Sequence, residues 1–140
     1  MALVLDTGPI LAALDADDPH HAACAALLAD APEPLVVVAS TLVEIDYWIR
    51  KGLTLEIWRS FVEDIADGAY RLEAVGEADL SRAAAIEEMY ADLDLGFVDA
   101  SVIAVCERLR EDKVATLDHR HFGTVRPAHC DAFRLLPERF

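Results

Sequence analysis

The sequence predicts an α/β domain in which a mostly parallel sheet carries helices on both faces. Short, continuously apolar segments alternate with longer segments whose apolar residues recur at helical spacing, a pattern typical of strands joined by right-handed helical crossovers. The chain has 140 residues, of which 54% are hydrophobic and 27% charged, which suits one packed domain. We therefore expect a single three-layer, Rossmann-like domain over residues 1–140.

The first half of the chain predicts two strands and four helices. Residues 2–5 form an apolar run that indicates a buried strand ending at Asp6, and Pro9 suits the first turn of the next helix. Leu35 to Val38 is the clearest strand, because consecutive β-branched residues disfavour a helix. Helices are expected from residue 7 through Leu14, from about 20 to 31, from 41 to near 52 and from about 54 to 67.

The second half predicts three strands and two helices. A weaker strand over 69–75 precedes a long helix over 77–92, and a turn at residues 94–96 leads into a helix that ends near Arg110. The run 113–117 predicts a strand that ends at Asp118, and 132–136 is the last candidate strand.

Four acidic residues fall near the carboxyl ends of these strands, where open α/β sheets bind their ligands. They are Asp6, Glu44, Asp99 and Asp118. Converging carboxylates in apolar surroundings repel one another unless some are protonated or a cation is present. The chain has only two lysines, Lys51 and Lys113, and neither is placed to neutralise them. A hard divalent cation, Mg²⁺ or Mn²⁺, is the simplest neutralising agent.

Each acid also has a purely structural interpretation. Asp6 or Thr7 could cap a helix, and Glu44 could complete a capping box begun by Ser40 or Thr41. Asp99 could stabilise a first helical turn, and Asp118 could form a turn. For any one of these acids, a structural role explains the residue about as well as a functional role. The presence of all four at one edge of the sheet favours a functional site.

The contexts of the acids resemble the PIN-domain ribonucleases, most closely the VapC-type toxins of toxin–antitoxin pairs. The similar segments, in order, are Val4–Leu11, Thr41–Glu44, Asp94–Ser101 and Ala115–Phe122. The resemblance spans essentially the whole chain. It implies a PIN-like fold and a Mg²⁺- or Mn²⁺-dependent endoribonuclease, commonly dimeric, that cuts structured RNA and is held inactive by a cognate antitoxin.

The resemblance also implies roles for individual residues. Asp6 and Asp99 match the principal metal ligands, and Glu44 and Asp118 match the acids that complete the metal site or orient the attacking water. Hydroxyl side chains beside these acids, which could orient them, are Thr7, Ser40, Ser101 and Thr116. Asp94 either joins this group or shapes the turn before Gly96, and we favour the turn.

The charge balance predicts weak intrinsic RNA affinity. A net charge of −14 leaves no basic stripe of the kind that neutralises phosphates. The best candidates for phosphate contacts are His119, Arg120, His121 and Arg126, with Arg50 and Lys51 as a second pair. Ordinary surface charge is the alternative interpretation of both groups.

Aromatic residues gather in the helices expected between residues 41 and 67: Tyr47, Trp48, Trp58 and Phe61. We favour core packing for them. The alternative is a groove for an apolar antitoxin segment or for a second protomer.

Other classes of protein are less consistent with the sequence. No G-x-S-x-G, G-x-G-x-x-G or P-loop motif is present, and three widely spaced cysteines, Cys24, Cys106 and Cys130, support neither disulfides nor a zinc site. The start lacks a secretory pattern and no apolar run suits a membrane span, so we expect a cytosolic protein. A receiver-like Mg²⁺-binding signalling module and a non-catalytic PIN-like binding protein remain alternatives.

Overall fold

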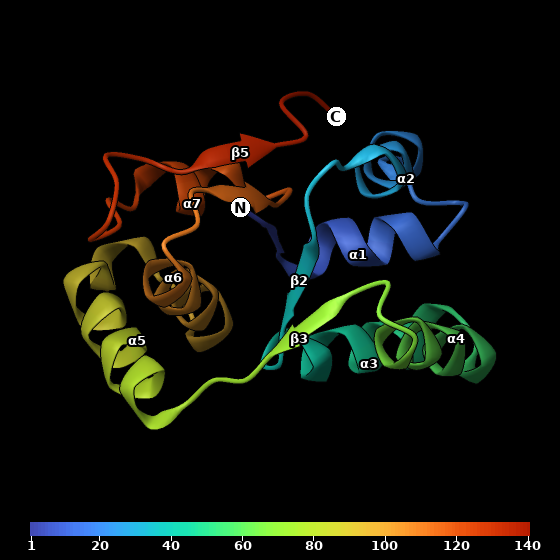
Figure 1. The fold of residues 1–140 in the computed structure, drawn as a ribbon, viewed down its shortest axis with the longest axis horizontal. Coiled ribbons are helices and arrows are strands. Elements are labelled where there is room, and N and C mark those ends of the chain that lie inside the picture. Colours follow the sequence, from blue (N-terminus) through green and yellow to red (C-terminus); the bar gives the residue numbers. More distant parts are fainter.

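The computed structural model describes residues 1–140, which fold around a five-stranded parallel sheet with the order β3-β2-β1-β4-β5 (Figure 1). The strands are β1 (Leu3–Leu5), β2 (Leu35–Val38), β3 (Arg71–Glu73), β4 (Lys113–Ala115) and β5 (Arg134–Leu136). The helices are α1 (Thr7–Leu14), α2 (His21–Asp30), α3 (Thr41–Gly52), α4 (Leu55–Ala66), α5 (Glu77–Met89), α6 (Phe97–Leu109) and α7 (His119–Thr124). Because all neighbouring strands run parallel, their carboxyl ends share one edge, which confirms the predicted α/β class.

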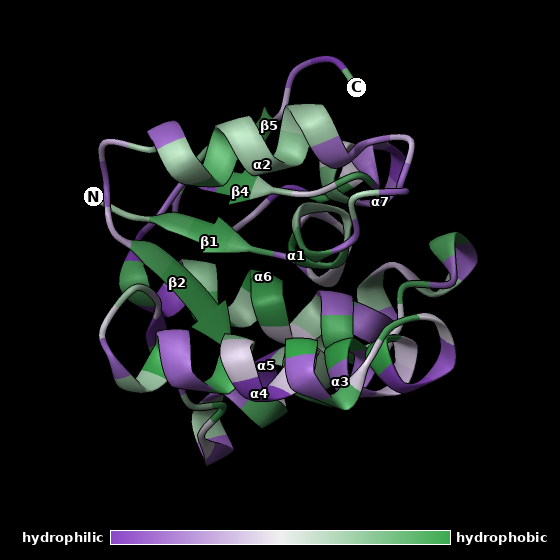
Figure 2. Cartoon of the chain, turned by 90° about the vertical axis from the view of Figure 1, so that its right-hand side faces the viewer, coloured by the Kyte–Doolittle hydropathy of each residue, from purple (hydrophilic) through white to green (hydrophobic).

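The sheet separates two hydrophobic layers. Side chains alternate along β1, so that Val4 packs toward α5 and α6 while Leu3 and Leu5 pack toward α1, α3 and α4. Figure 1 shows these two groups of helices on opposite sides of the strands. With both faces covered, the central strands are apolar along their whole length, as Figure 2 shows for β1 and β2.

Helix α6 is the most deeply buried helix and carries one of the predicted acids. Residues 100–106 are all buried, and its neighbour α5 packs along it. Its amino-terminal end lies at the carboxyl edge of the sheet, because the Ser101 hydroxyl bonds the hydroxyl of Ser40, which follows β2. Asp99 is thus attached to a rigid part of the core. None of the helices has the length and apolar content that crossing a bilayer requires.

Five elements differ from the sequence predictions. The strands expected over 69–75, 113–117 and 132–136 are shorter and span Arg71–Glu73, Lys113–Ala115 and Arg134–Leu136. The helix expected over 77–92 ends at Met89 and is followed by a 3₁₀ turn over Ala91–Leu93. The six-residue helix α7 was not predicted, because two histidines and Gly123 dilute its apolar pattern. It forms because the Asp118 carboxylate caps the amide of His121 at 3.0 Å and Phe122 is fully buried.

We expect Phe61→Ala to lower the free energy of unfolding by about 3–5 kcal/mol, because the ring fills the layer beneath α4 and truncation leaves a cavity. Phe61 has no exposed surface, whereas its neighbour Val62 is 43% exposed. Val62→Ala is the matched control and should change stability by less than about 0.5 kcal/mol. Urea unfolding measures both, and equal effects would contradict the assigned packing.

Candidate active site

The four predicted acids lie at the carboxyl edge of the central strands. Asp6 directly follows β1, and Asp118 lies between β4 and α7. Glu44 and Asp99 lie in the first turns of α3 and α6. The acids are close enough for charge to couple them: Asp99 and Glu44 raise the pKa of Asp6, and Asp118 and Glu44 raise that of Asp99. The fold therefore brings all four into one electrostatic site.

Asp6 is the most buried of these acids. It is only 7% exposed, and burial is the main reason why its pKa rises from 3.8 to about 7. The charge of Asp99 raises the pKa further, while hydrogen bonds from the Thr7 amide and the Thr116 hydroxyl lower it. An ionised Asp6 thus needs positive charge nearby at neutral pH.

The pKa of Asp99 is also raised. Its pKa rises to about 6, chiefly through burial and then through the charge of Asp118, while His121 opposes the rise. Removing a carboxylate from water without a counter-charge is unfavourable. In the apoprotein, Asp6 and Asp99 consequently hold protons at pH values where exposed aspartates are ionised.

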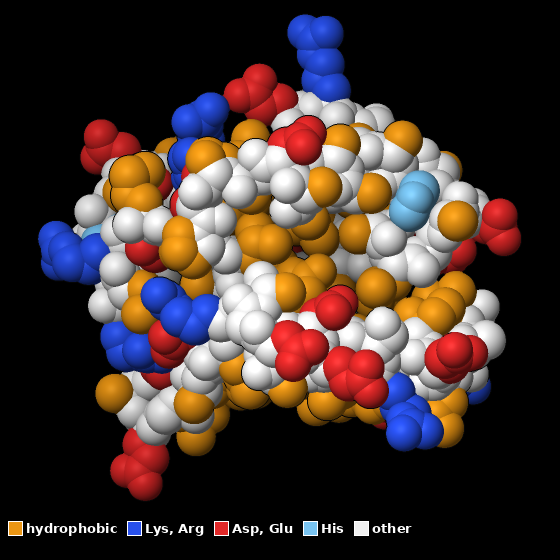
Figure 3. All heavy atoms as spheres, turned by 45° about the vertical axis from the view of Figure 1, so that its right-hand side comes forward, with side chains coloured by type: hydrophobic (Ala, Val, Ile, Leu, Met, Phe, Trp, Pro, Cys, Tyr) orange, Lys and Arg blue, Asp and Glu red, His pale blue; other side chains and the backbone are white.

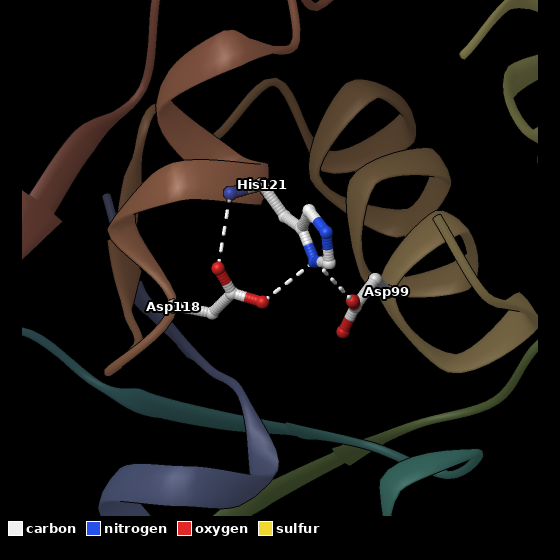
Figure 4. A group of neighbouring side chains, drawn as sticks. All are labelled: Asp99, Asp118 and His121. Atoms are coloured by element: carbon white, nitrogen blue, oxygen red, sulfur yellow. Dashed lines mark hydrogen bonds and ion pairs between the residues drawn. The ribbon is translucent and has the colours of Figure 1, made fainter. Parts of the chain in front are cut away.

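His121 joins the carboxylates rather than facing outward (Figure 4). Its Nδ1 lies 2.6 Å from Asp118 Oδ2 and 3.6 Å from Asp99 Oδ2. One ligand atom from each of the three residues lies within 4.8 Å of the others. Carboxylate oxygens are the donors that Mg²⁺ and Mn²⁺ prefer, so Asp99 and Asp118, beside the buried Asp6, fit the predicted metal. The imidazole nitrogen of His121 is a donor that suits softer cations better.

The spacing of His121 from Asp118 is a sequence signal for this position. Asp118 is followed by His119, Arg120 and His121. A carboxylate that caps a helix lies over the first turn, close to the backbone amide of the third residue after it, which here is His121. The Asp118 carboxylate caps the His121 amide and also contacts the His121 ring. A histidine three residues after a capping acid can thus share that acid's site.

Two threonine hydroxyls hold the acids in place. Thr116 is fully buried; its Oγ1 donates to Asp6 Oδ2 at 2.9 Å and accepts from the Asp118 amide at 2.9 Å. The Thr7 hydroxyl donates to Glu44 Oε1 at 2.7 Å. Each hydroxyl therefore links segments that are far apart in the sequence and limits the rotation of a carboxylate.

Ser40 and Ser101, the other two predicted hydroxyl residues, bond to each other. Their Oγ atoms are 2.6 Å apart, and Ser101 also bonds the Val98 carbonyl. The pair ties α3 to α6 beside the site, but neither hydroxyl bonds one of the four acids.

The capping-box interpretation of Glu44 is wrong. The Ser40 side chain makes no capping hydrogen bond, and the Thr41 hydroxyl donates instead to the Val38 carbonyl at 2.7 Å. Since Glu44 accepts from Thr7 of another helix, its carboxylate is directed to the site rather than to its own helix end.

Of the other candidates for RNA contact, Arg50 and Lys51 lie in the last turn of α3, where Arg50 pairs with Asp46, and the rest lie on or beside α7. Arg120 is exposed, while the Arg126 guanidinium donates to the Gly123 carbonyl at 3.0 Å. The His119 ring packs against Phe140. Asp94 is exposed with a φ of 56°, which is consistent with the predicted turn.

The aromatic residues of α3 and α4 divide between core and surface. Phe61 is buried and Trp58 packs against the core, as predicted, but Tyr47 and Trp48 are 44% and 54% exposed. Trp48 lines a groove of about 420 Å³ together with Leu11, Asp15, Asp18, Lys51, Gly52 and Leu53. Figure 3 shows hydrophobic side chains in the hollow of this side of the molecule and acidic side chains along its lower rim.

Comparison with known proteins identifies the class of this fold and site. Residues 3–126 match the PIN domain. The chain is 31% identical to "Ribonuclease VapC26" of Mycobacterium tuberculosis over 135 residues, which cover 96% of this chain and 100% of the relative. The chain belongs to the PIN-domain family. This confirms the resemblance to VapC-type ribonucleases that the sequence motifs predict.

Solved structures of low sequence identity share the fold. Mycobacterium tuberculosis VapC20, described as a sarcin-ricin loop cleaving toxin, has a TM-score of 0.75 at 19% identity, covering 80% of this chain and 86% of that one. VapBC2 from Rickettsia felis, bound to a DNA fragment from its promoter, has a TM-score of 0.69 at 13% identity, covering 96% and 97%. FitAcB from Neisseria gonorrhoeae has a TM-score of 0.62 at 20% identity, covering 84% and 88%.

The raised pKa values predict that the metal-free protein loses stability as pH rises from about 4 to about 7. Asp6 and Asp99 hold protons in the folded state at pH values where the unfolded chain has released them, so unfolding becomes more favourable until both are ionised. Asp99→Asn removes one charge and should stabilise the protein by up to about 3 kcal/mol at pH 8, with little effect at pH 4.

Thermal unfolding in EDTA across this pH range measures the effect. Asp17→Asn, a change at an exposed turn, is the control and should leave the profile unchanged. Parallel pH profiles for Asp99→Asn and the wild type would show that burial does not disfavour the Asp99 charge.

Thr116→Val should weaken Mn²⁺ binding about tenfold or more, because the isosteric side chain can no longer orient Asp6 and the Asp118 segment. Isothermal titration calorimetry measures the affinity. Thr124→Val removes an exposed hydroxyl that bonds the Arg120 carbonyl and serves as the control on α7. Equal affinity in the two variants would exclude an orienting role for Thr116.

Proposed function

We propose that this chain is a metal-dependent endoribonuclease that acts as the toxin of a toxin–antitoxin pair. The observation that carries the proposal is the buried Asp6 carboxylate beside Asp99, Asp118 and His121, a set whose charges require a cation. A solvated acidic surface would not combine burial, mutual repulsion and fixed hydroxyl partners. Membership of the PIN-domain family and the VapC relative support ribonuclease chemistry for such a site.

In this proposal Asp6, Asp99 and Asp118 would hold the cation, and the His121 Nδ1 lies beside the carboxylates of Asp118 and Asp99. When bound, Mg²⁺ or Mn²⁺ would stabilise the charge that develops on the scissile phosphate and lower the pKa of water. Glu44 is held through Oε1 by Thr7, which leaves Oε2 to accept a proton from the attacking water. The reaction is direct hydrolysis of a phosphodiester bond, with no covalent enzyme intermediate.

The RNA would approach along α7. Arg120 and His119 are the residues nearest the cluster in sequence that could contact the phosphates on either side of the scissile bond. Arg126, which follows the helix, contributes less, because its guanidinium donates to the carbonyls of Gly123 and Val125.

The antitoxin would bind the groove between α1 and α3. Trp48 and Leu11 offer an apolar contact, and Lys51 and Asp15 lie on the rim, so an amphipathic segment is the expected ligand. The similarity to VapBC2 and FitAcB is consistent with a toxin fold that is found in such assemblies.

A homodimer in the cytosol is the remaining part of the proposal. Leu80 and Phe97 are 52% and 41% exposed and line a second groove with Val75, near the carboxyl end of β3. Exposed apolar side chains of this size are typical of an interface.

Asp99→Asn should abolish Mn²⁺-dependent RNA cleavage, by at least about a hundredfold, while leaving the far-ultraviolet circular dichroism unchanged. The substitution keeps the shape of the side chain and removes the charge that would hold the ion. Mapping RNA ends after brief induction, together with a purified-protein cleavage assay, measures the effect and identifies the cut site. Asp17→Asn is again the matched control.

Cleavage that survives Asp99→Asn would remove Asp99 from the catalytic set. A folded wild-type protein that binds Mn²⁺ but cleaves no RNA would instead favour the non-catalytic binding protein.

A further inference from the structure

The basic residues of this acidic chain are unevenly distributed. Residues 110–140 contain six of the 12 Lys and Arg residues but only five of the 26 Asp and Glu residues. This segment forms β4, α7 and β5, the flank of the sheet next to the carboxylate cluster. This segment therefore does not share the strong negative charge of the chain as a whole.

Most basic residues of this flank have no carboxylate partner. In residues 1–109, Arg50, Arg71, Arg82 and Arg108 all form ion pairs with carboxylates. In residues 110–140 only Lys113 does so, with Glu33. The arginines that have no carboxylate partner there are Arg110, Arg120, Arg126, Arg134 and Arg139.

Two of these arginines line a groove of about 570 Å³ between α2 and β5. Arg134 and Arg139 lie on its rim, and Leu27, Leu136 and Pro137 form part of its apolar lining. Both arginines are exposed. Of the acids that line the groove, Glu33 is neutralised by Lys113, which leaves Asp30 unpaired against two guanidinium groups.

The groove extends along β5 from one edge of the sheet to the other. Arg134 begins β5 at the amino edge, whereas Leu136 ends β5 and pairs with Ala115 of β4, so the part of the groove at Pro137 and Arg139 lies nearer the carboxyl edge that carries Asp118. Beyond it, the Phe140 ring packs edge to face between His20 and His119, with ring centroids 5.0 and 5.1 Å away. Since Phe140 is 50% exposed, it presents an aromatic surface between the groove and α7.

We propose that the groove between α2 and β5 is an RNA subsite, which binds a single-stranded segment adjoining the phosphate that is cut. Arg134 and Arg139 contact phosphates, and a base stacks on Phe140. Apolar walls, an aromatic platform and arginines without partners are the features by which proteins hold single-stranded RNA. The inference rests on the proposed function for the position of the scissile phosphate, but it assigns the RNA path to residues outside the acidic site.

The test is the affinity for a fluorescently labelled, uridine-rich RNA oligonucleotide, measured by anisotropy in Ca²⁺, which takes oxygen ligands as Mg²⁺ does. The double variant Arg134→Gln/Arg139→Gln should bind about five- to tenfold more weakly at low salt. The slope of log K against log salt should become shallower by about 1.4, the value for two phosphate contacts on a single strand. Phe140→Ala should weaken binding about fivefold or more, and Phe140→Trp should restore it.

Arg59→Gln is the matched control, because Arg59 also lacks an ion pair but lies on α4, among Glu56, Ser60 and Glu63. It should leave the affinity and the salt slope unchanged. An arginine double variant with wild-type affinity, or with the same change as Arg59→Gln, would overturn the proposal. A groove that serves a peptide would give that result, because RNA binding would not depend on it.

The same proteins separate this inference from the proposed function. One outcome is that the double variant binds RNA more weakly than the wild type, while the wild type cleaves no RNA in Mn²⁺. That outcome would support the subsite and contradict the nuclease. Cleavage with unchanged affinity in the double variant would support the nuclease and contradict the subsite.

Discussion

The repulsion between carboxylates at the end of the sheet is the constraint on which the rest of this structure depends. Asp6 is buried and Asp99 is partly buried, and a neighbouring negative charge raises the pKa of each further. Water screens them less than it screens the many surface acids of the chain. The fold therefore holds these charges in an unfavourable arrangement in the apoprotein. A bound cation would relieve the repulsion, which favours cation binding.

The parallel sheet provides the rigidity that this arrangement needs. Carboxylates that repel one another would move apart if they lay on loops, but Asp6 directly follows a buried strand and Asp99 lies at the start of the most buried helix. Thr116 then connects the Asp6 carboxylate to the backbone of Asp118. Packing energy from both hydrophobic layers consequently opposes the electrostatic cost.

The sequence was sufficient to predict the fold class and the convergence of the four acids. Both follow from strand ends, which apolar runs such as Leu35–Val38 mark clearly, and from the rule that parallel strands end at one edge. Contacts between distant segments were not predictable in this way. The bond from Thr7 to Glu44 joins two helices, and local pattern alone suggested a capping box within one of them.

The surface was harder to predict than the core for a related reason. Helical spacing shows that Trp48 and Phe61 belong to amphipathic helices, but it does not show which face finds a partner within the chain. Phe61 is buried by β-sheet residues and Tyr70, whereas Trp48 remains more than half exposed. The sequence likewise predicts a phosphate contact for His121, whereas the structure places its ring beside Asp118 and Asp99, because α7 is too short to show a recognisable helical period.

The Asp118 carboxylate has two simultaneous tasks, and this affects how its substitutions should be interpreted. One oxygen caps the backbone of α7, and the other faces His121 in the acidic cluster. Asparagine preserves the first task and lacks the charge for the second, whereas alanine removes both and frees the short helix that carries His121. An alanine scan at this position would therefore confuse local unfolding with a loss of chemistry, and only the amide isostere separates the architecture of the helix from the charge of the site.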